Sequence, residues 1–414
     1  MRTLLSLTLA SLRHRRASFG LAVFSVAISV VLLLGIDRTR RDIKTHFLHT
    51  VSHTDLIAAA PAGDIETLLG LVFHLGDDRT RIAYDDFLKV QRMPQVAWSV
   101  PIARGDSLHG FDVIGTDASY FARYRYGDDR PLHVAAGKPF TRFYDAVLGS
   151  DVADALHLHV GDTLIIAHGH GAHAHAHARR PFRVSGILAP TLTPNDRSVF
   201  VRLDALEAIH VEWRSGRFVD MHLSADELRH LHVKPTHLSG MLIGLRHRSD
   251  VLAVKDAIDR DPQMKLRAVI PAAALAKLWR LLGSFERVLY AVSAAVFAAA
   301  LLGLTAMLLG TLDQRRREMA VLRTLGARPV QIFTLLMLEA LGAVVLGIAA
   351  GVLLLELLTL GADLAGIGLP LSYAITPRQL GLLALLLLSA LFAGAVPALG
   401  AYRRSLKDGM TVHA

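Results

Sequence analysis

The chain has 414 residues, 52% of them hydrophobic, with a formal net charge of +9 and no cysteine. That apolar share is too large for one water-soluble domain and too small for a bundle of ten or more membrane spans. Disulfides and thiolate metal sites are excluded, and the arginines gather beside apolar runs instead of alternating with aromatic residues, which argues against a nucleic-acid partner.

The first apolar run predicts a membrane span near the start of the chain. Residues 19–36 carry no charge and are long enough to cross a hydrocarbon layer of about 30 Å. Residues 1–18 place leucines among polar residues, which predicts a cytoplasmic amphipathic helix lying in the interface. No A-x-A-like cleavage site follows Ile36, so the pattern favours an uncleaved anchor over a signal peptide.

Residues 37–287 alternate strand-like and helix-like segments, which predicts a large extracytoplasmic (periplasmic) α+β domain. Residues 146–158 are predicted as a helix, and 163–167 and 182–188 as the two strands of a hairpin. The expected strands elsewhere are 98–102, 111–114, 198–203 and 242–245, and the expected helices are 65–75, 84–92, 204–210 and 250–259.

The predicted hairpin encloses a histidine-rich segment, residues 168–177, spaced by glycine and alanine. Its histidines are His168, His170, His173, His175 and His177. Neutral imidazoles bind Zn²⁺ and other late divalent metals at pH 7, so these five residues are the candidate metal ligands. An exposed low-complexity insert that binds metal only incidentally is the alternative interpretation.

Three further spans are predicted in the last third of the chain. They are residues 288–312, 332–360 and 380–399, joined by the loop 313–331 and the link 361–379 and followed by the tail 400–414. The loop and the tail are rich in arginine, which predicts that both termini are cytoplasmic. Arg38, Arg40, Arg41 and Lys44 oppose this orientation, since they follow the first span on the predicted outer side.

Two features inside the third span are candidates for packing or function. Gly347 and Gly351 form a G-x-x-x-G pattern, for which the alanine-rich second span offers a smooth partner face. Glu339 is a carboxylate within the span, and such groups are costly in lipid and often functional. For Glu339, a side chain that reaches back to the cytoplasmic arginines is the alternative.

Several motifs resemble the MacB/FtsX/LolC type of ABC transporter permease. Residues 318–327 read E-M-A-V-L-R-T-L-G-A and are followed by Glu339, residues 137–140 read G-K-P-F, and residues 397–410 begin P-A-L-G-A-Y. Residues 146–164 and 182–188 are similar to the outer-domain signature of that family. The histidine-rich segment departs from the pattern, because a short turn usually stands there.

The resemblance implies a four-span α-helical permease with its α+β domain inserted between the first and second spans, in the bacterial inner membrane. It implies that a separate cytosolic ATPase docks on Glu318, Met319, Leu322, Arg323, Leu325, Gly326 and Ala327. A second permease copy or paralogue, a periplasmic partner protein and membrane lipid are further expected partners. The substrate is expected outside the membrane or in its outer leaflet: a lipoprotein, peptide, drug or metal-related cargo.

The chain is not expected to be an enzyme by itself. No G-x-x-x-x-G-K-[ST] phosphate-binding loop occurs in it, so ATP is expected on the partner subunit and no cofactor on this one. The alternative function is a regulatory membrane protein without transport, in which the histidine-rich domain senses metal or pH.

Overall fold

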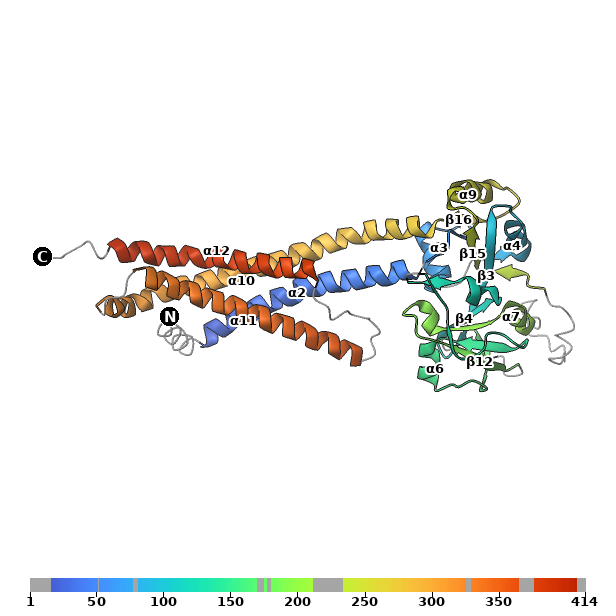
Figure 1. The fold of residues 1–414 in the computed structure, drawn as a ribbon, viewed down its shortest axis with the longest axis horizontal. Helices are drawn as coiled ribbons and strands as arrows, with labels where there is room; N and C mark the ends of the chain where they lie inside the picture. The colour runs from blue at the N-terminus through green and yellow to red at the C-terminus, as the bar shows by residue number, and fades with distance from the viewer. Residues whose placement is uncertain are drawn as a thin grey trace. The chain divides into compact units, whose positions relative to one another are not determined.

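The computed structural model describes residues 16–50, 52–76, 81–127, 129–169, 175–176, 180–210, 234–324, 329–364 and 376–407. The chain divides into two compact units (Figure 1). The first, called here the membrane unit, comprises residues 1–43 and 282–414, and the second, the outer domain, comprises residues 44–281.

In the residues that the structure describes, the membrane unit contains four helices. They are α2 (Arg16–His49), α10 (Pro271–Thr324), α11 (Pro329–Leu364) and α12 (Pro377–Lys407). Each contains a stretch long and apolar enough to cross a membrane: Phe19–Asp42, Pro271–Gly310, Phe333–Ala362 and Pro377–Gly400. One such helix before the α+β domain and three after it confirm the predicted fold class.

The helices α10, α11 and α12 each begin at a proline. Proline suits the first turn of a helix, where its missing N–H has no helical partner and its fixed φ is already helical. The first part of the predicted loop 313–331 is helical and continues α10 as far as Thr324. Residues 313–324 hold no glycine or proline that would end the helix, whereas Gly326 and Pro329 follow directly.

The G-x-x-x-G pattern packs against α2, not against the alanine-rich second span. A Cβ added to Gly347 would lie 2.6 Å from Val26 Cβ, and one added to Gly351 would lie 2.7 Å from the carbonyl oxygen of Ala27 and 2.7 Å from Val30 Cβ. All three distances are far below van der Waals contact, so glycine is required for α11 to approach the backbone of α2. This is a contact within the chain.

The outer domain is organised around one mixed sheet. Its main path runs β16-β1-β15-β3-β4-β13-β8-β12-β7. The bounds are β1 (Leu56–Ala59), β3 (Val96–Leu108), β4 (Phe111–Thr116), β7 (Val134–Gly137), β8 (Asp145–Leu148), β12 (Phe182–Leu188), β13 (Ser198–Arg202), β15 (Gly240–Leu245) and β16 (Arg267–Val269). Short strands β9 (Thr163–Leu164), β10 (Ala167–His168) and β11 (His175–Ala176) join its side, and β2 (Ile82–Ala83) with β14 (His237–Leu238) and β5 (Arg125–Tyr126) with β6 (Arg130–Pro131) form two small sheets.

Strand β3 is shared by two lobes of the outer domain (Figure 1). Its first half pairs with β15 and its second half with β4, and the register shifts between Ala103 and Asp106. Gly105 lies in this irregularity with φ +126°, a backbone conformation that favours glycine. The bulge therefore redirects β3 from one lobe to the other.

Short helices cover the sheet of each lobe. They are α3 (Asp64–Leu71), α4 (Tyr84–Gln91), α5 (Ser119–Arg123), α6 (Ser150–Leu156), α7 (Leu203–His210) and α9 (Val251–Arg260), with 3₁₀ turns at Pro194–Arg197 and Arg248–Asp250. Phe87, Met241 and Ile258 belong to the core of one lobe, and Val184 and Val199 to that of the other.

Two predicted elements of the outer domain are wrong in detail. Residues 146–158 do not form one helix, because Ala146, Val147 and Leu148 are buried in β8 and the helix α6 starts only after Gly149. The predicted first hairpin strand is divided: β9 pairs with β12, whereas β10 leaves that hairpin and pairs with β3 and β11.

Replacing Gly351 with alanine should destabilise the membrane unit by about 1–3 kcal/mol, because the added methyl group overlaps backbone and Val30 of α2. Gly342→Ala on the same helix is the matched control, since nothing lies within 4 Å of its added Cβ. Heating the detergent-solubilised chain and measuring what remains monodisperse compares the two variants. Equal thermal stability of both variants would contradict the close α2–α11 packing.

Candidate functional site

Four of the residues expected to contact an ATPase lie on the last turns of α10. Glu318, Met319, Leu322 and Arg323 are helical. Leu325, Gly326 and Ala327 lie outside the described residues.

Glu339 lies on α11 inside the membrane unit. Its side chain is buried, as are its neighbours Ala340, Ala343 and Val344, which form a core cluster with residues of α2, α10 and α12. A carboxylate in this place faces protein and not lipid, as expected for a polar group retained within a span.

A cluster of arginines and carboxylates ties the four membrane helices together. Arg38 of α2, whose side chain is 3% exposed, contacts Glu356 of α11 through both guanidinium Nη atoms, at 2.7 Å and 3.3 Å. Arg40 Nε lies 2.7 Å from a carboxylate oxygen of Glu286 on α10. The two-point geometry of the Arg38–Glu356 pair is the strongest form of such a contact.

Asp37 extends this arginine–carboxylate cluster to α12. Its Oδ1 atom lies 3.3 Å from Nε of Arg378 and accepts a hydrogen bond of 3.3 Å from the Tyr290 hydroxyl of α10. The Asp37 side chain is 4% exposed, so these partners stand in place of water around its carboxylate. Removing charge from water is tolerated only when it is paired in this way.

The cluster explains why basic residues follow the first span against the positive-inside pattern. Arg38 and Arg40 are paired with Glu356 and Glu286, and Arg41 Nε lies 3.5 Å from Asp42. The pairs of Arg38 and Arg40 are therefore part of the packing between helices, whereas Arg41 is paired within α2. The sequence does not reveal this pairing, because Arg38 and Glu356 are 318 residues apart.

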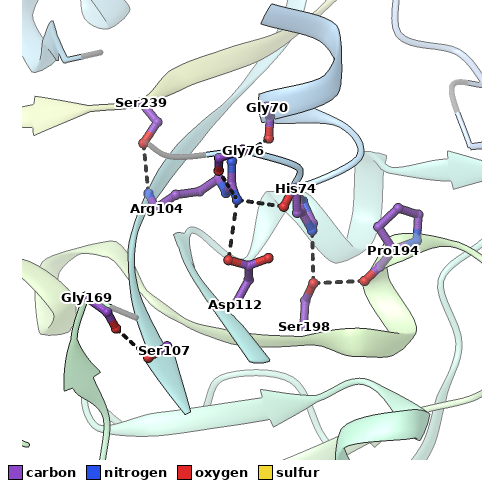
Figure 2. A network of polar contacts seen from close by, with 10 residues as sticks. All are labelled: Gly70, His74, Gly76, Arg104, Ser107, Asp112, Gly169, Pro194, Ser198 and Ser239. Atoms are coloured by element: carbon purple, nitrogen blue, oxygen red, sulfur yellow. Dashed lines mark hydrogen bonds and ion pairs between the residues drawn. The ribbon is translucent and has the colours of Figure 1, made fainter. Parts of the chain in front are cut away.

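A second buried network joins the lobes of the outer domain (Figure 2). The guanidinium of Arg104, on β3, donates to the carbonyl oxygens of Gly70 and His74 at 2.9 Å and 2.7 Å, and it lies 3.3 Å from Asp112. A cation at the end of α3 satisfies carbonyl groups that the helix leaves without partners. The Arg104 amide donates to Ser239 Oγ at 2.8 Å.

His74 connects this network to β13. Its Nδ1 atom lies 2.9 Å from Ser198 Oγ, and that hydroxyl donates to the carbonyl oxygen of Pro194 (Figure 2). The hydroxyl has one proton, so Nδ1 of His74 is the donor to Ser198. Burial, reinforced by the charge of Arg104, lowers the pKa of His74 from 6.5 to about 3, while Asp112 acts in the opposite direction. The network holds the lobes together through a neutral imidazole.

Two histidines of the histidine-rich segment lie on the paired strands β10 and β11. His168 lies on β10 and His175 on β11, directly opposite each other, whereas His170, His173 and His177 lie outside the described residues. His168 Nδ1 lies 2.8 Å from the Asp106 carboxylate of β3. The hydrogen bond with Asp106 raises the pKa of His168, against burial and the charge of Arg81. Within the part of the chain that the structure describes, no three histidine or acidic side chains form a metal-binding group.

Comparison with known proteins assigns the family. Residues 19–261 match the family of the MacB-like periplasmic core domain, and residues 290–406 match the FtsX-like permease C-terminal family. The chain belongs to the MacB/FtsX-type ABC permeases. This MacB/FtsX-type permease is a multi-pass protein of the bacterial inner membrane, and permeases of its family work with a cytosolic ABC ATPase.

Two solved structures are similar to the outer part of the permease. One is the periplasmic region of MacB from Actinobacillus actinomycetemcomitans, with 10% sequence identity and a TM-score of 0.34, covering 55% of this chain and 92% of that one. The other is the extracellular domain of the noncanonic ABC-type transporter YknZ from Gram-positive bacteria, with 13% identity, a TM-score of 0.30 and coverage of 52% and 99%. No curated protein matches the permease.

Breaking the Arg38–Glu356 pair should destabilise the membrane unit by about 3 kcal/mol, because each single change leaves a charge without its partner. Arg38→Ala and Glu356→Ala should each lower thermal stability in detergent, and the exchanged pair Arg38→Glu with Glu356→Arg should recover part of the loss. Arg287→Ala is the control, since Arg287 is exposed and donates only to Ser284 in the described contacts. Purely additive effects in the exchanged pair would argue against a direct interaction.

The outer domain should lose stability as the pH falls below 6.5. The unfolded chain protonates His74 near pH 6.5 and the folded chain only near pH 3, so each pH unit between these values removes up to about 1.4 kcal/mol. All three tryptophans, at 98, 213 and 279, lie in the outer domain, so tryptophan fluorescence of the full chain reports its unfolding. His74→Asn should flatten the pH dependence, and the exposed His159→Ala should not. Parallel curves for His74→Asn and the wild type would contradict the neutral buried imidazole.

Proposed function

We propose that the permease couples ATP hydrolysis by its cytosolic partner to movement of the outer domain. The observation that supports this most is the continuity of α10. Ala274 and Leu275 belong to a buried core cluster of the outer domain, Leu304 and Leu308 belong to that of the membrane unit, and Glu318 lies near the end of the same helix. A force applied near Glu318 is then transmitted along hydrogen-bonded backbone without an intervening loop.

The proposed orientation places both termini and residues 313–331 in the cytoplasm. Five arginines between 315 and 328 support it through the positive-inside rule. The opposing evidence from Arg38, Arg40 and Arg41 is weakened because these residues are paired with carboxylates. The outer domain then lies in the periplasm, where it would act on a substrate outside the membrane or in its outer leaflet.

The proposal includes three kinds of partner. The ATPase would contact residues 318–327, a second permease copy or paralogue would complete a dimer, and a periplasmic protein would receive or deliver the substrate. Lipoproteins, peptides, drugs and metal-related cargo are the substrate classes proposed for the outer domain. Nucleic acid is not among the proposed partners.

Glu318→Arg should reduce coupling of ATPase activity to the permease by at least tenfold, because it reverses a charge in the proposed contact. The permease is co-expressed with its cognate ATPase, and copurification and permease-dependent ATP hydrolysis are measured in lipid nanodiscs. Asp313→Arg, the same charge change five residues earlier on α10, is the control and should behave as the wild type. Normal coupling in Glu318→Arg and in Gly326→Pro together would refute the proposed contact.

A further inference from the structure

The chain that follows α2 is fastened to the outer domain within a few residues. The Tyr124 hydroxyl donates to the carbonyl oxygen of Thr50, the residue directly after α2, at 2.8 Å. Ser52 Oγ donates to the carbonyl oxygen of Gly127 at 2.6 Å, and Ser52 forms a β-bridge with Arg125. These contacts of Thr50 and Ser52 with residues 124–127 are called here the α2 clamp.

The other connection of the outer domain to the membrane helices begins in the same place. Ala274 and Leu275, in the first turns of α10, are each 2% exposed and belong to one hydrophobic cluster with Tyr124. Trp279 of α10 packs against that cluster. Both covalent connections, the one after α2 and the one through α10, are therefore held at a single hydrophobic cluster.

This cluster reaches both lobes of the outer domain. It contains Ile57 of β1 and Leu242 of β15 from one lobe, and Leu188 of β12 and Phe200 of β13 from the other. Close-packed protein interiors have few voids and low compressibility, so they transmit strain. A displacement of the end of α2 relative to the start of α10 would then reach both lobes, provided that the α2 clamp holds.

Two neighbouring tyrosines differ in what their hydroxyl groups bind. Tyr120 and Tyr124 are 2% and 6% exposed, and their rings stack with centroids 5.1 Å apart. The Tyr120 hydroxyl donates to Asn195 Oδ1 at 2.6 Å, within the outer domain. Asn195 and Thr193 also lie beside the Tyr124 hydroxyl. Of the two hydroxyl groups, the one of Tyr124 donates to the residue that follows α2.

We propose that Tyr124 is a positioning residue for the transmission of movement, and that its hydroxyl makes the outer domain follow α2. A hydrogen bond shielded from water is stronger than an exposed one, and here it joins the end of α2 to the cluster that also holds α10. Without it, the chain after α2 takes up part of the displacement. This inference rests on the proposed function and adds the place where movement enters the outer domain.

The test compares Tyr124→Phe with Tyr120→Phe. Each variant keeps a buried ring and loses a hydroxyl that donates one hydrogen bond, so each should lower the folding equilibrium constant of the outer domain by about 2- to 10-fold. Urea unfolding of the full chain, followed by tryptophan fluorescence, measures this loss, since Trp98 and Trp279 pack against the cluster. A merely structural role predicts that the two variants behave alike in every assay.

Amide hydrogen exchange then measures movement. The full chain is reconstituted in nanodiscs with its cognate ATPase, and exchange in peptides of β12 and β13 is compared without nucleotide and with ATP and vanadate. We expect exchange to respond to nucleotide in the wild type and in Tyr120→Phe, and the response to fall at least about threefold in Tyr124→Phe.

A second matched pair removes a smaller side-chain contact. Ser52→Ala takes one hydrogen bond from the α2 clamp, whereas Ser185→Ala takes one from β12, where Ser185 Oγ donates to the carbonyl oxygen of Ala146 at 3.1 Å. The nucleotide response should fall in Ser52→Ala and persist in Ser185→Ala.

Equal nucleotide responses in Tyr124→Phe and Tyr120→Phe would overturn the inference and, as long as the wild type responds, leave the proposed coupling intact. A wild type whose outer domain shows no response to nucleotide would overturn the proposed coupling and this inference together. The two failures are therefore distinguishable.

Discussion

Charged side chains buried inside a helix bundle must be paired, and the membrane unit depends on the ion pairs that meet this requirement. Arg38 and Glu356 bring α2 and α11 together, and Asp37 adds α10 and α12 through Tyr290 and Arg378. The desolvation of each charge is offset only while the helices keep this arrangement. Because the G-x-x-x-G contact also joins α2 to α11, the two helices are held by close backbone packing along their length and by an ion pair beyond it.

The outer domain meets a related requirement with a buried polar network. The guanidinium of Arg104 donates hydrogen bonds to carbonyl groups at the end of α3, and Asp112 balances its charge. These contacts hold the bent strand β3 against the helix α3. A neutral His74 completes the network by donating to Ser198. The same strand then supplies Asp106 and the carbonyl oxygen of Gly105 to the histidine-rich segment. One strand therefore links the two lobes and anchors the insert that departs from the family pattern.

The proposed coupling to an ATPase depends on the continuity of α10. Family membership establishes an ABC permease subunit that works with a cytosolic ATPase. The single helix α10 contains residues of the outer-domain core, residues of the membrane-unit core, and part of the segment that resembles the family's ATPase-docking motif.

The sequence by itself determined the four apolar helices, the inserted α+β domain and the family, because hydrophobic length, arginine placement and short motifs are local properties. It also identified the five histidines of residues 168–177. It did not determine that residues 146–148 form a strand, since a short apolar run is compatible with helix or strand until neighbours pair with it. Only the tertiary structure decided that Gly347 and Gly351 face α2, that Arg38 meets Glu356, and that Asp106 lies opposite His168. Each of these contacts joins residues distant in the chain, and a partner brought close by folding leaves no signal in the spacing of one sequence.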